Sequence, residues 1–164
     1  MMEFIADSGE RREFGTGAVR DMASKGRCDL LPWDVIGKLY SHDPLISSFC
    51  ECIGCAVHHD NLGRSIESAL YNFIVIAYQG NSATALLDNA FHFEAGAKKY
   101  SNRNWENGIP VDVFLDSAGR HFLKWMRGDK DEHHDRAVVW NLLCALWTID
   151  NKPEMIDAPT GGVE

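Results

Sequence analysis

The sequence predicts an all-α domain, a helical bundle of about five helices, and three observations support it. Within 83–97, apolar side chains recur at spacings of three and four, at Ala83, Leu86, Leu87, Ala90 and Ala97. The same spacing recurs within 111–126, at Val111, Phe114, Leu115, Ala118, Phe122 and Trp125. No stretch of useful length alternates apolar and polar residues. Because these spacings match the helical turn, the pattern favours helix over strand.

The first hundred residues divide into two zones. Residues 1–35 are polar and contain two turn-like phrases with glycine, GTGAVRD and KGRCDLLP. Residues 36–100 are expected to form helices, with breaks at the turn-forming clusters DNLG (60–63) and QGNS (79–82).

A connector rich in turn formers, 101–110, comes next. Two helices are predicted after it, at 111–127 and 132–149, separated by the loop RGDKDE. The tail 151–164 contains Pro and Gly with little apolar content, and we expect it to be loose. The chain is therefore expected to form one domain over 1–150.

Composition excludes some classes of function. The chain has 164 residues, 45% hydrophobic and 24% charged, which suits one packed domain. Acidic residues outnumber basic ones by 24 to 16. A protein that binds polymeric nucleic acid needs a surplus of Lys and Arg, so we expect no such partner. A single nucleotide is compatible with this charge, because a few local cations or a metal ion neutralise one triphosphate.

No targeting segment is apparent. No stretch reaches the roughly 18 apolar residues that a membrane span requires. The first residues, MMEFIADSGERREF, have acids where a secretory signal has bases. Five cysteines are too few, and odd in number, for a disulfide scaffold. We therefore expect a soluble, cytoplasmic protein that makes no contact with a membrane.

Polar residues on apolar faces are the candidates for chemistry. Glu94 continues the stripe that contains Ala90 and Ala97, so its carboxylate is predicted to point toward the interior. A buried carboxylate must pair with a cation or take up a proton. Either Lys98, one turn further on, forms an ion pair with Glu94, or Glu94 is a metal ligand.

Two histidines and an asparagine are also predicted on apolar faces, and each has a structural and a functional interpretation. His121 shares the buried face of its helix with Phe114 and Trp125, and it is either a satisfied core histidine or a ligand or proton-transfer group. His134 and Asn141 lie two turns apart on one line of the last helix. They either hydrogen-bond between helices or bind a base or sugar hydroxyl.

Two groups of charged residues have an ordinary and a functional interpretation. Asp112, Asp116, Arg120 and Lys124 follow one another at i, i+4, as on a solvated and salt-bridged face. That face is functional only if it closes against another helix or subunit. The acids of DKDEHHD suit a helix start, but Asp131, Glu132 and Asp135 also offer the oxygen ligands that Mg²⁺ prefers.

The stretch Cys50-x-Cys52-x-x-Cys55, followed by His58 and His59, invites a zinc site. The chain has no second ligand pair, and the same stretch forms an amphipathic pattern, so buried thiols on a helix are the simpler interpretation. A Gly-rich phosphate loop, a dinucleotide fingerprint and HExxH are missing from the sequence. Phosphate binding would therefore depend on metal and on dispersed Lys and Arg.

Four phrases together resemble a known family. FGTGAVRD (14–21), KGRCDLLP (25–32), FEAGAKKYSNRNWENGIP (93–110) and LDSAGRHFLKWMRGDKDEHHDRAVVWNLL (115–143) resemble, in this order, the phage-associated dATP/dGTP diphosphohydrolases. That family is similar to the all-α pyrophosphohydrolases of the MazG type. Residues 41–88 lie outside these phrases and are interpreted as a helical insertion.

The resemblance implies cleavage of dGTP or dATP to the monophosphate and pyrophosphate with Mg²⁺ or Mn²⁺. Carboxylates from several helices would hold the ions, and Lys and Arg would neutralise the departing pyrophosphate. In phages with such enzymes, the product feeds altered purine deoxynucleotide pools. MazG-type proteins commonly build their bundle from two chains, which implies a homodimer or homotetramer.

The family phrases also imply roles for individual residues. The implied metal ligands are Glu94, Asp116, Asp131, Glu132 and Asp135. The implied catalytic groups are Glu94, His121 and Glu132. The implied substrate-binding residues are Arg20, Lys25, Arg27, Lys98, Arg103, Asn104, Trp105, Arg120, His134 and Asn141. Among them, Trp105 would stack on the purine, and Lys98 or Arg103 would touch phosphate. The first Glu-x-x-Glu pair of MazG-type enzymes is incomplete, because residue 97 is Ala.

Two other functions are compatible with the residues. His121, His134 and nearby acids would bind metal in an HD-type phosphohydrolase, which releases triphosphate or single phosphates. A non-catalytic helical module with a structural zinc at the cysteines is the third hypothesis.

Overall fold

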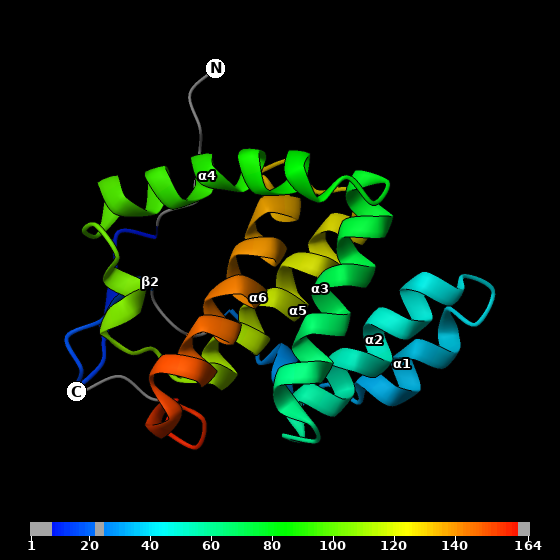
Figure 1. Ribbon diagram of the computed structural model, residues 1–164, viewed down its shortest axis with the longest axis horizontal. Helices are drawn as coiled ribbons and strands as arrows, with labels where there is room; N and C mark the ends of the chain where they lie inside the picture. The colour runs from blue at the N-terminus through cyan, green and yellow to red at the C-terminus, as the bar shows by residue number, and fades with distance from the viewer. Residues whose placement is uncertain (1–7, 22–24, 161–164) are drawn as a thin grey trace.

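The computed structural model describes residues 8–21 and 25–160, and in these residues six α-helices make up most of the fold (Figure 1). They are α1 (Trp33–Leu39), α2 (Pro44–Val57), α3 (Leu62–Tyr78), α4 (Ser82–Lys99), α5 (Val111–Arg127) and α6 (His134–Asn151). Short 3-10 turns lie at Cys28–Leu30, Asn104–Asn107 and Pro153–Met155. The predicted all-α class is confirmed. None of the described helices combines the length and the apolar content that crossing a membrane would need.

A small antiparallel ribbon precedes the helices. Its strands are β1 (Arg11–Glu13) and β2 (Val19–Asp21), with Arg12 opposite Arg20. A tight turn joins them, in which the Phe14 amide donates to the Ala18 carbonyl and Gly17 has φ +81°. Sequence analysis found the turn but not the ribbon, because three-residue strands are too short to show an alternating pattern.

Local capping explains where several helices begin and end. Asp43 caps α2 by accepting from two backbone amides of its first turn, and Pro44 occupies the first helical position. Asn81 caps α4, and α5 ends at Gly128 with φ +85°. The last helix begins at His134 rather than at the predicted residue 132.

The centre of the bundle is an aromatic core. Figure 1 shows α5 and α6 side by side, with α3 next to α6 and with α2 and α1 further out. Phe122 of α5 stacks on Phe49 of α2, with ring centroids 4.1 Å apart, and Phe73 of α3 packs on both rings. The region 41–88, interpreted as an insertion, therefore supplies part of the core.

Helix α4 presents the opposite face from the one predicted. Leu87 is 73% exposed and Leu86 is 50% exposed, whereas Ala85 and Asn89 are buried against the bundle. Figure 1 shows the reason, since α4 lies across the ends of the other helices and only one side of it touches them. The predicted interior position of the Glu94 carboxylate is consequently wrong, because its side chain is 56% exposed.

The described part of the predicted loose tail is attached to the fold. Arg12 Nη1 donates to the Thr160 carbonyl at 2.9 Å, and the Asp157 carboxylate lies 3.3 Å from His59 Nδ1. Residues 161–164 of that tail lie outside the described residues.

Close packing of α5 on Trp33 generates a stability prediction. A Cβ atom on Gly119 would lie 2.5 Å from Cζ2 of Trp33, which is itself only 1% exposed. Gly119→Ala is therefore expected to lower the free energy of unfolding by about 1–3 kcal/mol, measured by urea denaturation. The control is Gly63→Ala in α3, where a Cβ meets nothing within 4 Å. It is expected to be neutral or to gain up to about 1 kcal/mol. The same change in the free energy of unfolding in both variants would contradict the packing argument.

Candidate functional site

A cavity of about 910 Å³ lies between the β-ribbon, the second half of α4, the 101–105 connector, α5 and α6. Twelve of the residues predicted from sequence line it: Arg20, Lys25, Arg27, Glu94, Arg103, Asn104, Trp105, Asp116, Arg120, His121, Glu132 and Asn141. Four others do not line it: Lys98, Asp131, His134 and Asp135. Segments far apart in sequence therefore meet at one concave site, the usual shape of a small-molecule site.

Arg20 is the central cation of the cavity. It projects from β2, and its Nη2 donates to Ser117 Oγ at 3.3 Å and to Asn141 Oδ1 at 3.1 Å. Its guanidinium lies over the Phe114 and Trp140 rings, 5.3 Å from each centroid. Burial lowers the pKa of Arg20 to about 10, so the group keeps its charge at neutral pH.

Among the described residues, no carboxylate neutralises that charge. In the described ranges 8–21 and 25–160, Arg20 has no acidic side chain within ion-pair distance, and its enclosed Nη1 has no hydrogen-bond partner. A desolvated cation without a counter-charge is costly unless an anion binds beside it. This part of the cavity is therefore chemically suited to an anion.

The charged line along α5 is half enclosed rather than solvated. Asp116 is 15% and Arg120 17% exposed, and the two form an ion pair. Asp116 Oδ1 also accepts from the Cys28 amide at 2.6 Å. The functional interpretation of this face required closure against another helix or subunit; the element that packs on it is the 3-10 turn at Cys28–Leu30, and the functional role stays a prediction. Asp116 thereby attaches the N-terminal segment to α5.

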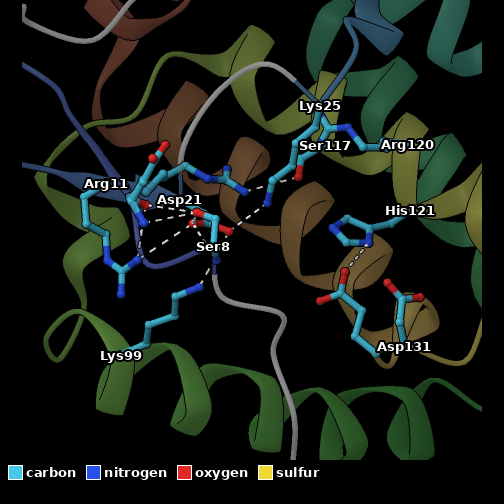
Figure 2. A network of polar contacts seen from close by, with 12 residues as sticks. Ser8, Arg11, Asp21, Lys25, Lys99, Ser117, Arg120, His121 and Asp131 are labelled. Carbon is cyan, nitrogen blue, oxygen red and sulfur yellow. Dashed lines mark hydrogen bonds and ion pairs between the residues drawn. The ribbon is translucent and has the colours of Figure 1, made fainter.

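A second polar group surrounds Asp21 at the end of β2 (Figure 2). Its carboxylate accepts from Ser8 and, at 2.7 Å, from Lys25 Nζ, while Lys99 Nζ lies 3.8 Å away. Burial alone would raise the pKa of Asp21, but the hydrogen bonds from Lys25 and Ser8 outweigh it and hold the pKa at about 2.

Two imidazoles and a carboxylate meet at the end of the cavity formed by α5 and the start of α6. His121 Nδ1 lies 2.9 Å from His134 Nδ1, and Glu132 Oε1 lies 3.4 Å from the first and 3.6 Å from the second. Burial, followed by the charges of His134 and Arg120, holds the pKa of His121 well below its ordinary value. His121 is therefore neutral at pH 7, and neutral imidazole is the form that binds metal or accepts a proton.

The five acids predicted as metal ligands do not form one group within the chain. Two sets of three side chains could hold an ion among the described residues: His121 with Glu132 and His134, and Asp129 with Asp131 and His134. Glu94 at the cavity rim pairs with Lys98 at 2.5 Å. Asp135 lies 3.4 Å from the Tyr78 hydroxyl on α3. The metal-binding roles of Glu94, Asp116 and Asp135 stay predictions.

The aromatic part of the cavity contains Phe93, Trp105 and Trp140. Trp105 packs edge-on against Phe93, with centroids 5.7 Å apart, and Phe93 in turn lies 6.0 Å from Trp140. Asn104 beside them both accepts from the Val19 amide and donates to the Val19 carbonyl, at 2.8 and 2.7 Å. The Asn104 amide therefore holds the ribbon over the cavity, as Asn141 holds Arg20.

Sequence reasoning missed several lining residues: Arg12, Asp21, His92, Lys99, Tyr100, Lys124 and Trp140. Lys99 is instructive, because its side chain is 8% exposed while the predicted Lys98 is 73% exposed. The error follows from the reversed face of α4. A pattern built on Ala85 and Asn89 would have selected Lys99.

The cysteines do not contribute to a metal group in the described part of the chain. Cys50 is buried, Cys52 half-buried and Cys55 exposed along α2, and all are free thiols. The helix therefore points them in different directions.

A family model described as dATP/dGTP diphosphohydrolase, N-terminal, matches residues 66–158, more than half of the chain. The match covers α4, α5 and α6 and begins within the region interpreted as an insertion. No curated protein and no solved structure matches the chain.

The polar group around Asp21 predicts how the stability of the protein depends on pH. Because the pKa of Asp21 in the fold, about 2, lies below its ordinary 3.8, the ionised group stabilises the protein above about pH 4. That stability is lost as the pH falls toward 2. We expect Asp21→Asn to cost about 1–2 kcal/mol of unfolding free energy at pH 6, and the cost to shrink between pH 4 and pH 2. Asp150→Asn, at an exposed position near the end of α6, is the control and should change little. If Asp21→Asn cost the same unfolding free energy at pH 6 and at pH 2, the low pKa of Asp21 would be contradicted.

Proposed function

We propose that this chain, which belongs to the dATP/dGTP diphosphohydrolase family, cleaves dGTP or dATP to the monophosphate and pyrophosphate. The proposed reaction depends on Mg²⁺ or Mn²⁺ and serves phage nucleotide metabolism. The observation that supports it most is the enclosed charge of Arg20, which has no carboxylate partner among the described residues and faces a cavity large enough for a nucleotide.

The triphosphate would bind among the cations of the cavity. Arg20 of β2 and Arg120 of α5 both line the cavity, and each has one enclosed nitrogen without a partner in the described residues. Lys124, one turn beyond Arg120, lies toward the His121 end. Fixed cations in a partly dry site stabilise charge that develops on departing phosphate oxygens. These residues would therefore neutralise the pyrophosphate as it leaves.

The base would bind at the aromatic end. Trp105, Phe93 and Trp140 provide ring faces and edges there, and aromatic side chains stack on purines. This agrees with the implied role of Trp105.

A divalent ion bound to the phosphates would supply Lewis acidity and lower the pKa of the attacking water. His121, Glu132 and His134 are the residues that would hold it at the cavity, since their donor atoms lie within 4.8 Å of one another. Asp116 would position Arg120 through their ion pair, and Asn141 would position Arg20 through its amide oxygen.

The HD-type phosphohydrolase is the second candidate, and one observation favours it. Imidazoles rather than carboxylates alone gather at the α5–α6 end of the cavity. That reaction would release nucleoside and triphosphate.

Product analysis tests both candidates. The protein is incubated with each common nucleoside triphosphate and with Mg²⁺ or Mn²⁺, and the products are separated by anion-exchange chromatography. Deoxynucleoside monophosphate with pyrophosphate from dGTP or dATP is expected. Nucleoside with triphosphate would support the second candidate, and no turnover of any nucleotide would overturn both.

Arg120 is expected to act on the substrate rather than only on the fold. Because its charge would face the phosphates, Arg120→Ala should lower kcat/KM for dGTP by at least about tenfold, a loss of about 1.4 kcal/mol. The control is Arg127→Ala on the same helix, where the arginine also pairs with an aspartate but is 71% exposed and lies off the cavity. Equal kcat/KM in the two variants would remove Arg120 from the site.

We also propose that the chain is a homodimer or homotetramer. The outer face of α4 supports this, because Leu86, Leu87 and Phe91 are between 49% and 73% exposed on one helix. Leu87→Glu is expected to reduce the mass measured by light scattering to that of one chain. Leu39→Glu on α1, at an equally exposed leucine (71%), should leave the mass unchanged. A wild-type mass of one chain would exclude an oligomer.

A further inference from the structure

We propose that His121, Glu132 and His134 form a nitrogen-rich metal site that selects Mn²⁺, Co²⁺ or a similar transition ion over Mg²⁺, with Asp131 as its positioning residue. This inference deepens the proposed function, since it identifies the ion on which that reaction would depend. The distances among the three side chains support it independently of that reaction, and metal binding is measurable without nucleotide.

The spacing of the three donor atoms fits one ion. The three separations among His121 Nδ1, His134 Nδ1 and Glu132 Oε1 are 2.9, 3.4 and 3.6 Å. Ligand atoms bonded at about 2.1 Å lie about 3.0 Å apart in an octahedral site and about 3.4 Å apart in a tetrahedral one. An ion would therefore replace the histidine–histidine hydrogen bond with little movement of the side chains.

The surrounding hydrogen bonds prepare His134 as a ligand. Its Nε2 lies 2.8 Å from Asp131 Oδ1, and Asp131 Oδ2 accepts from Lys124 Nζ at 3.0 Å. A carboxylate beside Nε2 favours the tautomer with the proton on that nitrogen, which leaves the lone pair on Nδ1. Nδ1 is the atom that faces His121 and Glu132. Figure 2 shows His121 and Asp131 in this region, away from the Asp21 cluster.

The site opens to the cavity on one side only. His121 and Glu132 line the cavity, and their side chains are 15% and 9% exposed. His134 closes the other side at 1% exposure. Three protein ligands at the edge of the cavity leave coordination positions for phosphate or water.

The alternative set, Asp129 with Asp131 and His134, is less suited to an ion. Asp129 is held by Arg127 through two hydrogen bonds, and Asp131 by Lys124. A metal there would have to displace both cations. It would also lie on the Nε2 side of His134, and neither acid lines the cavity.

The donor set determines which ion binds. Mg²⁺ prefers an all-oxygen environment, whereas imidazole suits later first-row ions such as Fe²⁺, Ni²⁺ and Zn²⁺, and the affinity of such a site rises from Mn²⁺ to Co²⁺. Two imidazoles among three protein ligands therefore favour the transition ions, in the order Mn²⁺ below Co²⁺.

Calorimetric titration of the metal-free, full-length protein with Mg²⁺, Mn²⁺ or Co²⁺ tests the proposal. We expect Co²⁺ to bind tightest, and Mn²⁺ to bind at least about tenfold more tightly than Mg²⁺. Glu132→Gln should weaken Co²⁺ binding at least about tenfold, and Asp131→Asn, which removes the orienting charge, about 10- to 100-fold. The Co²⁺ absorption spectrum reports nitrogen ligation and should change in His121→Asn.

Matched variants separate the possible outcomes. Asp150→Asn, at an exposed position outside the cavity lining, should bind Co²⁺ like the wild type. Loss of binding in Asp129→Asn but not in Glu132→Gln would place the ion in the alternative set and overturn the proposal, as would preferential binding of Mg²⁺. Circular dichroism of each variant checks that it is folded. A protein that binds Co²⁺ as expected but turns over no nucleotide would retain this inference and lose only the proposed function.

Discussion

The placement of one arginine constrains the rest of the site. Arg20 lies in a three-residue strand, and its guanidinium is enclosed by Phe114 and Trp140 from the two central helices. Ser117 and Asn141 satisfy one nitrogen, while no carboxylate in the described residues balances the charge. The helices and the ribbon together hold this cation, and an anion bound in the cavity would offset the cost of burying it. The cavity is therefore a consequence of how the protein accommodates this cation.

The packing of α5 on α6 supplies the chemistry at the other end of the cavity. The loop between them brings Asp131 and Glu132 back toward α5, so that side chains ten or more residues apart converge on His121. Lys124 links this end to the cationic wall, because it lines the cavity and also holds Asp131. The proposed phosphate and metal sites would thus lie next to each other, with Lys124 between them. The family match covers both helices but not Arg20.

The buried face of α4 shows where a prediction from hydrophobic periodicity fails. Alanine and leucine repeat on one face of this helix, and hydrophobic periodicity assigns that face to the interior. The bundle instead covers the side with Ala85 and Asn89, where the Asn89 amide donates to the Arg136 carbonyl. Because α4 is turned about its axis relative to the prediction, Glu94 lies at the cavity rim rather than in the interior. For the same reason Lys99, and not Lys98, lines the cavity. A partner surface on the outer face would satisfy both the sequence pattern and the observed packing.

The sequence by itself determined the helical class, the boundaries of α5 to within a residue, and twelve of the residues that line the cavity, because periodicity, turn formers and family phrases are local properties of the chain. Tertiary structure alone decided which acids meet imidazoles and which pair with lysine or arginine. It also decided that Asp116 faces inward although it lies off the apolar stripe of α5. These outcomes depend on distances between side chains from different helices, and a linear pattern carries no information about how far apart two helices place their polar groups.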